Sequence, residues 1–537
     1  MSSDVVSTGS TKQSAARRPV AWGPGGVDEQ VQGRAWIVHP PVLAVLLVVL
    51  WVALALAVNT AQYGDHFEQF AWAQTLEWGY HKHPPLPTWL LGAALRLGGF
   101  EPWWPSVLAA GCIGLNLVLT WRIGCWLLGA ERAGLAVLLA GLQQGFAGKA
   151  QLFNHNSVMV LCISLVVWLS LRVSQRDPRS PRTLWCWVWI GVGAGLALLA
   201  KYQAALPLLG VLVALGLSGA LRHPAQRRGV GLAVLLAVLI FLPHLSWVAT
   251  HGWTTLAYAT QAGVELTFGQ RVGSLLKFLI IQVRILGPAL LLFGLVVYLA
   301  RRAAGQGAGE RPGAAEVDAG LPARRAWLIG LLGVPVAGVT VTALLGGLRL
   351  QDHWGIQTFQ YLGLLLAASW PATRPIDGRR VIRIALALHL LWMVAYTAPR
   401  WIDAARSDRQ RLDEFFPAQQ IADAVGTAWR QSTAGCPLRY VRGPGFEAGI
   451  VSVYLDAHPA SIDENLLHTP WIDPARLLEA GHVHVRLGGP PARDEWSGND
   501  AVLRGQFDFE VPAQRRQPHQ TLHWMIVLPE TCTVPAP

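Results

Sequence analysis

Apolar blocks of about 17 to 25 residues, the length that crosses a hydrocarbon core, recur along most of the chain and stop near residue 400. Each block therefore predicts a membrane span. The pattern as a whole predicts an all-α polytopic membrane domain of about eleven transmembrane helices. The blocks lie near 41–59, 105–128, 132–148, 155–172, 184–200, 202–220, 230–249, 273–300, 326–346, 356–372 and 381–398.

The two ends of the chain differ from this apolar middle. The N-terminal residues are polar and rich in Ser, Gly and Arg, with no secretory cleavage pattern, which predicts a disordered cytoplasmic tail. After residue 400, a polar helical stretch around 407–431 precedes strand-like runs at 438–441 and 524–528, separated by Pro- and Gly-rich turns. We expect a tail over 1–38, a membrane domain over 39–399 with a first external loop at 60–104, and an external (periplasmic) α/β domain over 400–537.

Arginine content differs between the two sides of the predicted spans. Loops 172–182, 222–228, 301–325 and 374–383 are rich in Arg, whereas the connections on the other side contain little of it. Because Lys and Arg concentrate in cytoplasmic loops, this distribution places the N-terminus in the cytoplasm. An odd number of spans then places the C-terminal domain outside.

The overall composition agrees with a membrane protein. Only 14% of the residues are charged and 52% are hydrophobic, whereas a soluble domain has about 25% charged residues. The net charge is +11, but the basic residues interrupt apolar blocks instead of forming one soluble patch. Nucleic acid is therefore not predicted as a partner. Membrane lipids are the predicted partners instead.

The first external loop contains a cluster of side chains capable of catalysis. Asp65 and Glu68 are three residues apart and share one face of a short predicted helix. A carboxylate at the membrane surface can act as a general base on an acceptor hydroxyl or amine. A solvated helix start, with Asp65 near its N-cap, is the structural alternative.

This loop resembles the first-loop signature of bacterial relatives of dolichyl-phosphate-mannose protein mannosyltransferases. That family includes aminoarabinose transferases and lies in the glycosyltransferase C superfamily. Similar blocks follow in the same order at 191–202, 243–253 and 282–288, so the resemblance covers about residues 40–400. The matching first-loop residues are Trp72, Gln74, Gly79, Tyr80, His83, Pro84, Pro85 and Leu86.

The resemblance implies a bacterial inner (plasma) membrane enzyme that transfers a hexosyl or pentosyl group from a polyprenyl-phosphate donor. The acceptor would be a glycan, lipid or protein of the envelope on the external face, and Asp65 would be the catalytic base. His66 stands where the family pair has Glu, so either His66 or Glu68 is expected to supply a second contact. Many relatives have a further Asp where this chain has Asn154, His155 and Asn156, which makes these three candidates for acceptor or sugar binding.

Lysine is scarce, because the chain has 43 Lys and Arg residues in total and only Lys12, Lys82, Lys149, Lys201 and Lys277 are Lys. The last four map to the outer ends of spans or to external loops, where a polyprenyl phosphate presents its anionic head. Snorkelling to the interface is the alternative explanation. The candidate donor-phosphate residues are Lys82, His83, Lys201 and Tyr202, together with Arg284, for which a structural ion pair is an equal alternative.

Metal and disulfide predictions follow from the remaining reactive side chains. The outer histidines fit no zinc-binding spacing, so no metal ligands are assigned; a divalent metal held by residues from separate loops remains open. No other cofactor is indicated. Cys436 and Cys532 are the only cysteines after residue 400, and an oxidising compartment favours a disulfide between them over two free thiols.

Many membrane spans with polar residues are also typical of another class of protein. A multispan lipid or glycan transporter or flippase, without transferase chemistry, is the main alternative. Transporters typically contain inverted repeats and polar groups at the midplane, whereas the polar residues here concentrate on one side. That asymmetry favours an enzyme at the interface over a transporter, and over a non-catalytic assembly factor.

Overall fold

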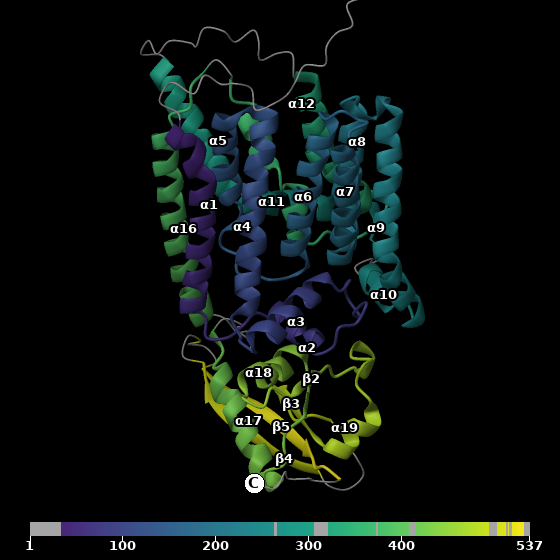
Figure 1. Cartoon of the computed structure of the whole chain (residues 1–537). Coiled ribbons are helices and arrows are strands. Elements are labelled where there is room, and N and C mark those ends of the chain that lie inside the picture. The colour runs from purple at the N-terminus through teal and green to yellow at the C-terminus, as the bar shows by residue number, and fades with distance from the viewer. Residues whose placement is uncertain are drawn as a thin grey trace, which may run out of the picture.

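A bundle of long helices carries a smaller domain of strands and helices at one end, and helices of the first external loop lie between the two (Figure 1). This computed structural model describes residues 34–261, 266–304, 321–371, 374–406, 415–492, 502–511, 514 and 518–530. Residues 1–33 of the predicted tail lie outside the described residues. The first helix begins at Arg34, within the range that was predicted as tail.

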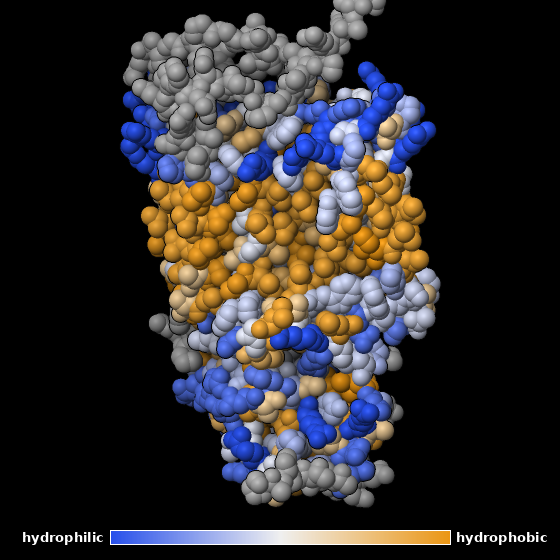
Figure 2. Space-filling model, in the orientation of Figure 1, coloured by the Kyte–Doolittle hydropathy of each residue, from blue (hydrophilic) through white to orange (hydrophobic). Residues whose placement is uncertain are grey.

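Among the described residues, eight helical segments are long and apolar enough to cross a membrane. Large apolar side chains point outward along them and form the hydrophobic belt of Figure 2, as a lipid environment requires. The helices that contain these segments are α1 (Arg34–Val58), α4 (Trp104–Leu128), α6 (His155–Ser174), α7 (Pro181–Ala200), α9 (Pro224–Thr250), α11 (Phe268–Ala304), the continuous pair α12 (Leu321–Leu328) and α13 (Val334–Leu344), and α16 (Gly378–Arg406).

Three of the eleven predicted spans are shorter helices in the structure. They are α5 (Ala130–Gly141), α8 (Ala205–Leu217) and α15 (Leu362–Ala368). Hydropathy averages over local breaks, and polar Gln143 and Gln144 end the apolar run after α5. The membrane domain is all-α as predicted; eight of the eleven predicted spans correspond to the long helices and three to these shorter ones.

The first external loop folds into α2 (Gly64–Ala73) and α3 (Leu86–Gly98). The backbone amides and carbonyls of Tyr80 and His83 hydrogen-bond each other and form a tight turn between the two helices. Trp72 stacks on Tyr80 with ring centroids 5.0 Å apart. Short helices connect other elements: α10 (Thr254–Gln261), α14 (Gly355–Thr358), and the 3-10 turns Gln144–Phe146, Tyr202–Ala204, Ala220–Arg222, Asp352–Trp354 and Leu466–His468.

The C-terminal domain is α/β, as predicted. Its sheet has the order β2-β1-β3-β5-β4, with β1 parallel to β2 and β3, and β5 antiparallel to β3 and β4. The elements are α17 (Ala418–Ser432), β1 (Tyr440–Arg442), α18 (Gly445–Tyr454), β2 (Ala460–Ile462), α19 (Pro474–Ala480), β3 (His482–Leu487), β4 (Val502–Glu510) and β5 (His519–Val527).

The cysteines divide between the two parts of the chain. Cys112, Cys125, Cys162 and Cys186 on the membrane helices are free thiols. Cys436 is disulfide-bonded, and its predicted partner Cys532 lies outside the described residues. The pairing of Cys436 with Cys532 stays a prediction.

The C-terminal domain packs directly on the first external loop through α18 and α2. The Phe67 ring of α2 makes edge contacts with Phe446 and Tyr454, at centroid distances of 5.4 and 6.3 Å. Gly449 of α18 faces the same ring, because a Cβ built at this glycine would lie 2.5 Å from the Cβ of Phe67. The Thr60 hydroxyl adds a hydrogen bond to the Phe416 carbonyl, 2.9 Å away. The domain is therefore fixed to the helix that carries Asp65.

Replacing Gly449 with Val should weaken this docking, because the added methyl groups collide with Phe67. Overpacking of this kind costs roughly 1–3 kcal/mol. We expect a lower Tm in detergent and faster tryptic release of the C-terminal domain. Gly445→Val on the same helix is the matched control, since a Cβ there meets nothing within 4 Å. Equal effects of the two substitutions would contradict the packing described here.

Candidate functional site

One large cavity lies where the ends of the membrane helices meet the predicted first external loop, residues 60–104. Its volume is about 830 Å³, which is within the range of small-molecule sites. The cavity extends from the loop helix α2 to side chains on the membrane helices α6, α11 and α13. The residues predicted for the site that line it are Asp65, Glu68, Lys82, His83, Asn154, His155, Asn156, Lys201 and Tyr202, and Lys149 joins them.

Asp65 lies in the first turn of α2, with its side chain exposed to this cavity. The amide nitrogen Nδ2 of Asn154 donates a hydrogen bond to Asp65 Oδ2 over 3.0 Å. Among the described residues, Oδ1 has no hydrogen-bond partner. The carboxylate is thus oriented through one oxygen, and the other can accept a proton or a hydrogen bond.

Asn154 also begins the membrane helix α6. Its side-chain oxygen accepts hydrogen bonds from the backbone amides of Asn156 and Ser157. The Ser157 hydroxyl oxygen in turn accepts a hydrogen bond from the Asn154 backbone amide, which completes a capping box. Asn and Asp are both strong N-cap residues. Only Asn, however, also has an amide group that can donate to the neighbouring carboxylate, whereas Asp would add a like charge there.

His66, one of the two candidates for the second contact, is fully buried beneath α2 and does not line the cavity. Its Nε2 accepts from the Phe153 amide at 3.0 Å, so the ring proton must lie on Nδ1, which donates to Gln62 Oε1 at 2.7 Å. Burial lowers the pKa of His66 to about 4, an effect that Asp65 partly opposes. This neutral ring holds α2 against the segment that precedes α6.

Glu68, the other candidate for the second contact, lines the cavity and forms an ion pair with Lys82. Burial raises the pKa of Glu68, while Lys82 opposes that shift. Burial also disfavours the charged form of Lys82, but Glu68, Tyr258 and Asp463 together outweigh this effect and raise the pKa of Lys82. The pair is half-buried and keeps a cation at the edge of the cavity.

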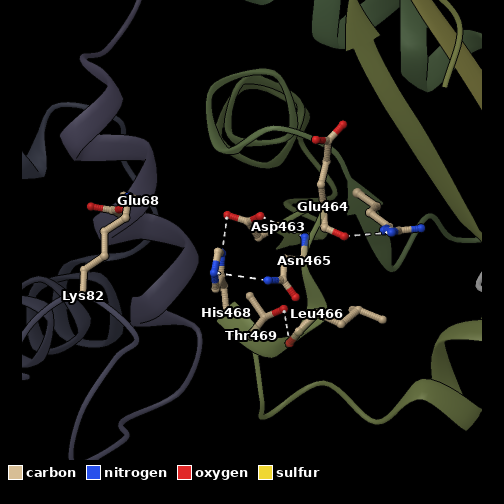
Figure 3. A network of polar contacts seen from close by, with 9 residues as sticks. Glu68, Lys82, Asp463, Glu464, Asn465, Leu466, His468 and Thr469 are labelled. Atoms are coloured by element: carbon tan, nitrogen blue, oxygen red, sulfur yellow. Dashed lines mark hydrogen bonds and ion pairs between the residues drawn. The ribbon is translucent and has the colours of Figure 1, made fainter. Parts of the chain in front are cut away.

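The C-terminal domain closes over this ion pair. Figure 3 shows Glu68 and Lys82 facing each other, with the Asp463–Thr469 segment of the domain across from them. Asp463 lies close enough to act electrostatically on both partners. Next to them, the rings of His81 and His468 stack with centroids 4.0 Å apart. The environment of Lys82 therefore depends on two segments far apart in the sequence.

Lys201 supplies a second cation at the boundary between α7 and α8. Its Nζ donates to Asn156 Oδ1 over 2.8 Å, and the residue is buried. The two asparagines at the start of α6 thus contact opposite charges: Asn154 holds Asp65 and Asn156 holds Lys201. The same helix end fixes the positions of the candidate base and of a candidate phosphate ligand.

His83 lies beside His155, with ring centroids 4.0 Å apart. Burial lowers the pKa of His83 well below its usual value, and the nearby His155, Lys201 and Lys82 lower it further. The ring is therefore neutral near pH 7. It can donate one hydrogen bond to a donor phosphate, but it does not add a positive charge.

Tyr202 is held by a chain of hydrogen bonds that involves His244 and Trp78. The Trp78 carbonyl accepts from His244 Nδ1 at 2.7 Å, so Nε2 is unprotonated and accepts the Tyr202 hydroxyl proton at 2.7 Å. The Tyr202 hydroxyl therefore donates its proton in the hydrogen bond to His244. Its hydroxyl oxygen lines the cavity as an acceptor, a role that does not suit an anionic phosphate.

Arg284 does not join the site. Its side chain is exposed on the outer surface of α11, and the cavity is instead lined by Gln282, Ile285 and Leu286 of that helix. Lys277 is likewise exposed on α11 and does not line the cavity. The structure thus does not bring these two cations together with Lys82, Lys149 and Lys201.

Sequence reasoning missed the segment 351–357, which forms one wall of the cavity. The signal was a polar run, Gln351-Asp352-His353, between two apolar blocks. Several glutamines also line the cavity and had no recognisable spacing. Within the described residues, no group of three or more His, Cys, Asp and Glu side chains converges to hold a metal ion.

His66 makes the fold sensitive to acid. The unfolded histidine has a pKa of 6.5 and the folded one of about 4, so the unfolded chain binds more protons between these values. Stability attributable to neutral His66 should be complete above pH 6.5 and fall as the pH drops toward 4, by up to about 3 kcal/mol.

Melting curves in detergent at pH 7.5 and pH 5 test this expectation. The Tm of the wild type should fall more than that of His66→Gln, which keeps a donor and an acceptor without titrating. His519→Gln, at an exposed histidine, should behave as the wild type does. An identical fall in the wild type and His66→Gln would contradict the role of His66.

Comparisons with known proteins agree with this architecture. Residues 82–247 match the family described as dolichyl-phosphate-mannose-protein mannosyltransferase; the matched range begins after Asp65. The lipid A galacturonosyltransferase RgtD of Rhizobium johnstonii is 25% identical over 254 residues, which cover 46% of this chain and 51% of that protein. The chain thus spans about half the length of this curated relative.

A solved structure extends the similarity to the whole fold. The crystal structure of ArnT from Cupriavidus metallidurans, bound to undecaprenyl phosphate, superposes with a TM-score of 0.54 at 13% identity. The match covers 92% of this chain and 98% of ArnT, so it includes both the helix bundle and the C-terminal domain. Together, these matches confirm the chain's resemblance to the bacterial mannosyltransferase-like and aminoarabinose-transferase-like proteins of the glycosyltransferase C superfamily.

Proposed function

We propose that this chain is an integral membrane glycosyltransferase that moves a sugar from a polyprenyl-phosphate donor to an envelope acceptor on the external face. One observation supports this more than any other. A single cavity beside the first external loop, at the end of the membrane helices, is lined by Asp65 together with Lys82, Lys149 and Lys201. A base and several cations in one cavity match the needs of this transfer.

In the proposed reaction, the Asp65 carboxylate acts on the acceptor and the lysines act on the donor phosphate. The acceptor oxygen or nitrogen bonds to the anomeric carbon of the sugar, and Asp65 takes the proton that this atom loses. The bond between the anomeric carbon and the phosphate oxygen breaks, and the polyprenyl phosphate leaves with that electron pair. Lys82 and Lys201, with Lys149 nearby, stabilise the negative charge on the leaving phosphate.

The names of similar proteins support the donor and the acceptor classes. ArnT binds undecaprenyl phosphate in its crystal structure, and RgtD is named for its action on lipid A. A polyprenyl-phosphate sugar is therefore the proposed donor, and an envelope lipid, glycan or protein is the proposed acceptor. The proposed location is a bacterial inner membrane.

Asp65→Asn is the direct test, because the amide retains the size of the side chain but cannot accept the proton. In proteoliposomes with radiolabelled polyprenyl-phosphate sugar and an envelope-lipid acceptor, transfer should fall at least 100-fold, as for loss of a general base. Tm should be unchanged. Asp456→Asn, at an exposed carboxylate outside the cavity, is the control and should transfer normally.

The same experiment distinguishes the transporter alternative. Near-normal transfer by Asp65→Asn would remove Asp65 as the base. Movement of the donor lipid between leaflets, with no transfer by the wild type to any envelope acceptor, would instead favour a flippase.

We also propose that the basic end of the bundle is cytoplasmic and that the C-terminal domain is periplasmic. Gln175 lies in the Arg-rich connection between α6 and α7, and Asp456 lies in the C-terminal domain; both are exposed. With a membrane-impermeant maleimide, Asp456→Cys should be labelled once the outer membrane is opened. Gln175→Cys should require opening of the inner membrane as well. The opposite labelling order would reverse the proposed orientation.

A further inference from the structure

The tight turn between α2 and α3 divides its four side chains between two roles. Lys82 and His83 line the cavity, whereas Tyr80 and His81 are buried, at 0% and 7% exposed. The backbone amides of Tyr80 and His83 each donate to the carbonyl of the other residue, over 3.1 and 3.3 Å. Contacts that fix the rings of Tyr80 and His81 therefore also fix the two residues that face the cavity.

The first external loop supplies one set of these contacts. Trp72 of α2 stacks on Tyr80 with ring centroids 5.0 Å apart and meets His81 edge-on at 5.8 Å. The Tyr80 hydroxyl donates to the Thr75 carbonyl at 2.8 Å. These contacts hold the turn against α2.

The C-terminal domain supplies a second set, from the segment between β2 and α19. His468 stacks on His81 with centroids 4.0 Å apart and rings 7° from parallel, and Trp471 meets Tyr80 edge-on at 5.6 Å. Burial lowers the pKa of His81 to about 3, and nearby His468 and Lys82 contribute to the shift. The His81 ring is therefore neutral near pH 7 and can remain stacked at this pH.

His468 is oriented by its own domain. Asp463 Oδ2 lies 3.4 Å from His468 Nδ1, and Asp463 Oδ1 accepts from the Asn465 backbone amide at 3.0 Å (Figure 3). The described residues of the C-terminal domain do not themselves line the cavity. The domain therefore reaches the cavity through the turn that it contacts.

We propose that His468 and Trp471 are positioning residues of the donor-phosphate site, which they hold in place through the turn at 80–83. This inference rests on the proposed function and gives the C-terminal domain a part in donor binding. A turn held only by α2 would have to be ordered when the phosphate binds, and that ordering lowers affinity. The alternative is that the two rings only attach the domain to the loop.

A matched pair of histidines separates these two roles. His458 also comes from the C-terminal domain and stacks on a ring of the first external loop, that of Phe100, with centroids 3.7 Å apart. Its Nδ1 contacts the Ser452 carbonyl at 3.3 Å, much as His468 Nδ1 contacts Asp463. Phe100, however, does not line the cavity and lies outside the turn.

Substitution by Asn suits both positions. The amide of Asn can replace the Nδ1 donor while the stacked ring is removed, and Asn tolerates the positive φ of 42° at His458. His468→Asn and His458→Asn thus each remove one ring contact between the same two parts of the chain. Only His468→Asn removes it at the turn.

Hydrogen exchange in the lipid-free protein tests the positioning directly. The Tyr80 and His83 amides are hydrogen-bonded across the turn, so they exchange when the turn opens. His468→Asn should speed their exchange about three- to ten-fold, the loss expected for one stacked ring pair, and Trp471→Leu should act in the same direction. His468→Phe, which keeps a ring, should restore slow exchange, and His458→Asn should match the wild type. Equal exchange in the two Asn variants would overturn the inference.

Binding of undecaprenyl phosphate, measured by native mass spectrometry, tests the consequence for the donor. His468→Asn should bind this lipid about three- to ten-fold more weakly, and His458→Asn should bind it as the wild type does. In a Lys82→Met background the further loss caused by His468→Asn should be smaller, because residues that act through one another are not additive. An undiminished loss there would overturn the inference.

The two measurements also separate this inference from the proposed function. A wild type that neither binds undecaprenyl phosphate nor transfers sugar from any polyprenyl-phosphate donor would overturn the proposed function. Hydrogen exchange would still decide whether the C-terminal domain holds the turn. Normal lipid binding by His468→Asn, with a wild type that binds and transfers, would overturn the inference alone.

Discussion

The arrangement of the cavity depends on the side chain of Asn154 more than on any other group. One amide group caps the membrane helix α6 with its oxygen and holds the Asp65 carboxylate with its nitrogen. Two residues later, Asn156 holds the Lys201 ammonium. Because these bonds share one helix end, the first-loop helix α2 and the α7–α8 junction are fixed to the same rigid element. The Asp65 carboxylate and the Lys201 ammonium can then keep a constant separation, as the proposed reaction requires.

The C-terminal domain is part of the structure that supports this site. Phe67 lies on the opposite side of α2 from the cavity and packs against α18, where Gly449 provides the necessary space. His66, next to it, anchors α2 to the chain before α6. The helix that carries Asp65 is therefore held from two sides. A displacement of the domain would move α2 and alter the Glu68–Lys82 pair at the edge of the cavity.

Charged residues of the site could be predicted because their types are rare in a membrane sequence. Lys82 and Lys201 stood out as two of five lysines, and Asp65 through a family resemblance. The sequence could not decide between His66 and Glu68, because nearby positions on a helix point in different directions and only the fold shows that His66 is the buried one. In the same way, only the fold shows that Arg284 is exposed on α11 and away from the cavity. The glutamines were missed, since an uncharged side chain within an apolar block has no spacing that distinguishes a ligand contact from helix packing.

The cavity lining combines charged and amide side chains, which differ in how well they tolerate burial. Lys82 and Glu68 are half-buried and neutralise each other, and the buried Lys201 donates to Asn156. A lone charge placed deeper would need a partner of its own, whereas an amide carries only a dipole and can be buried at lower cost.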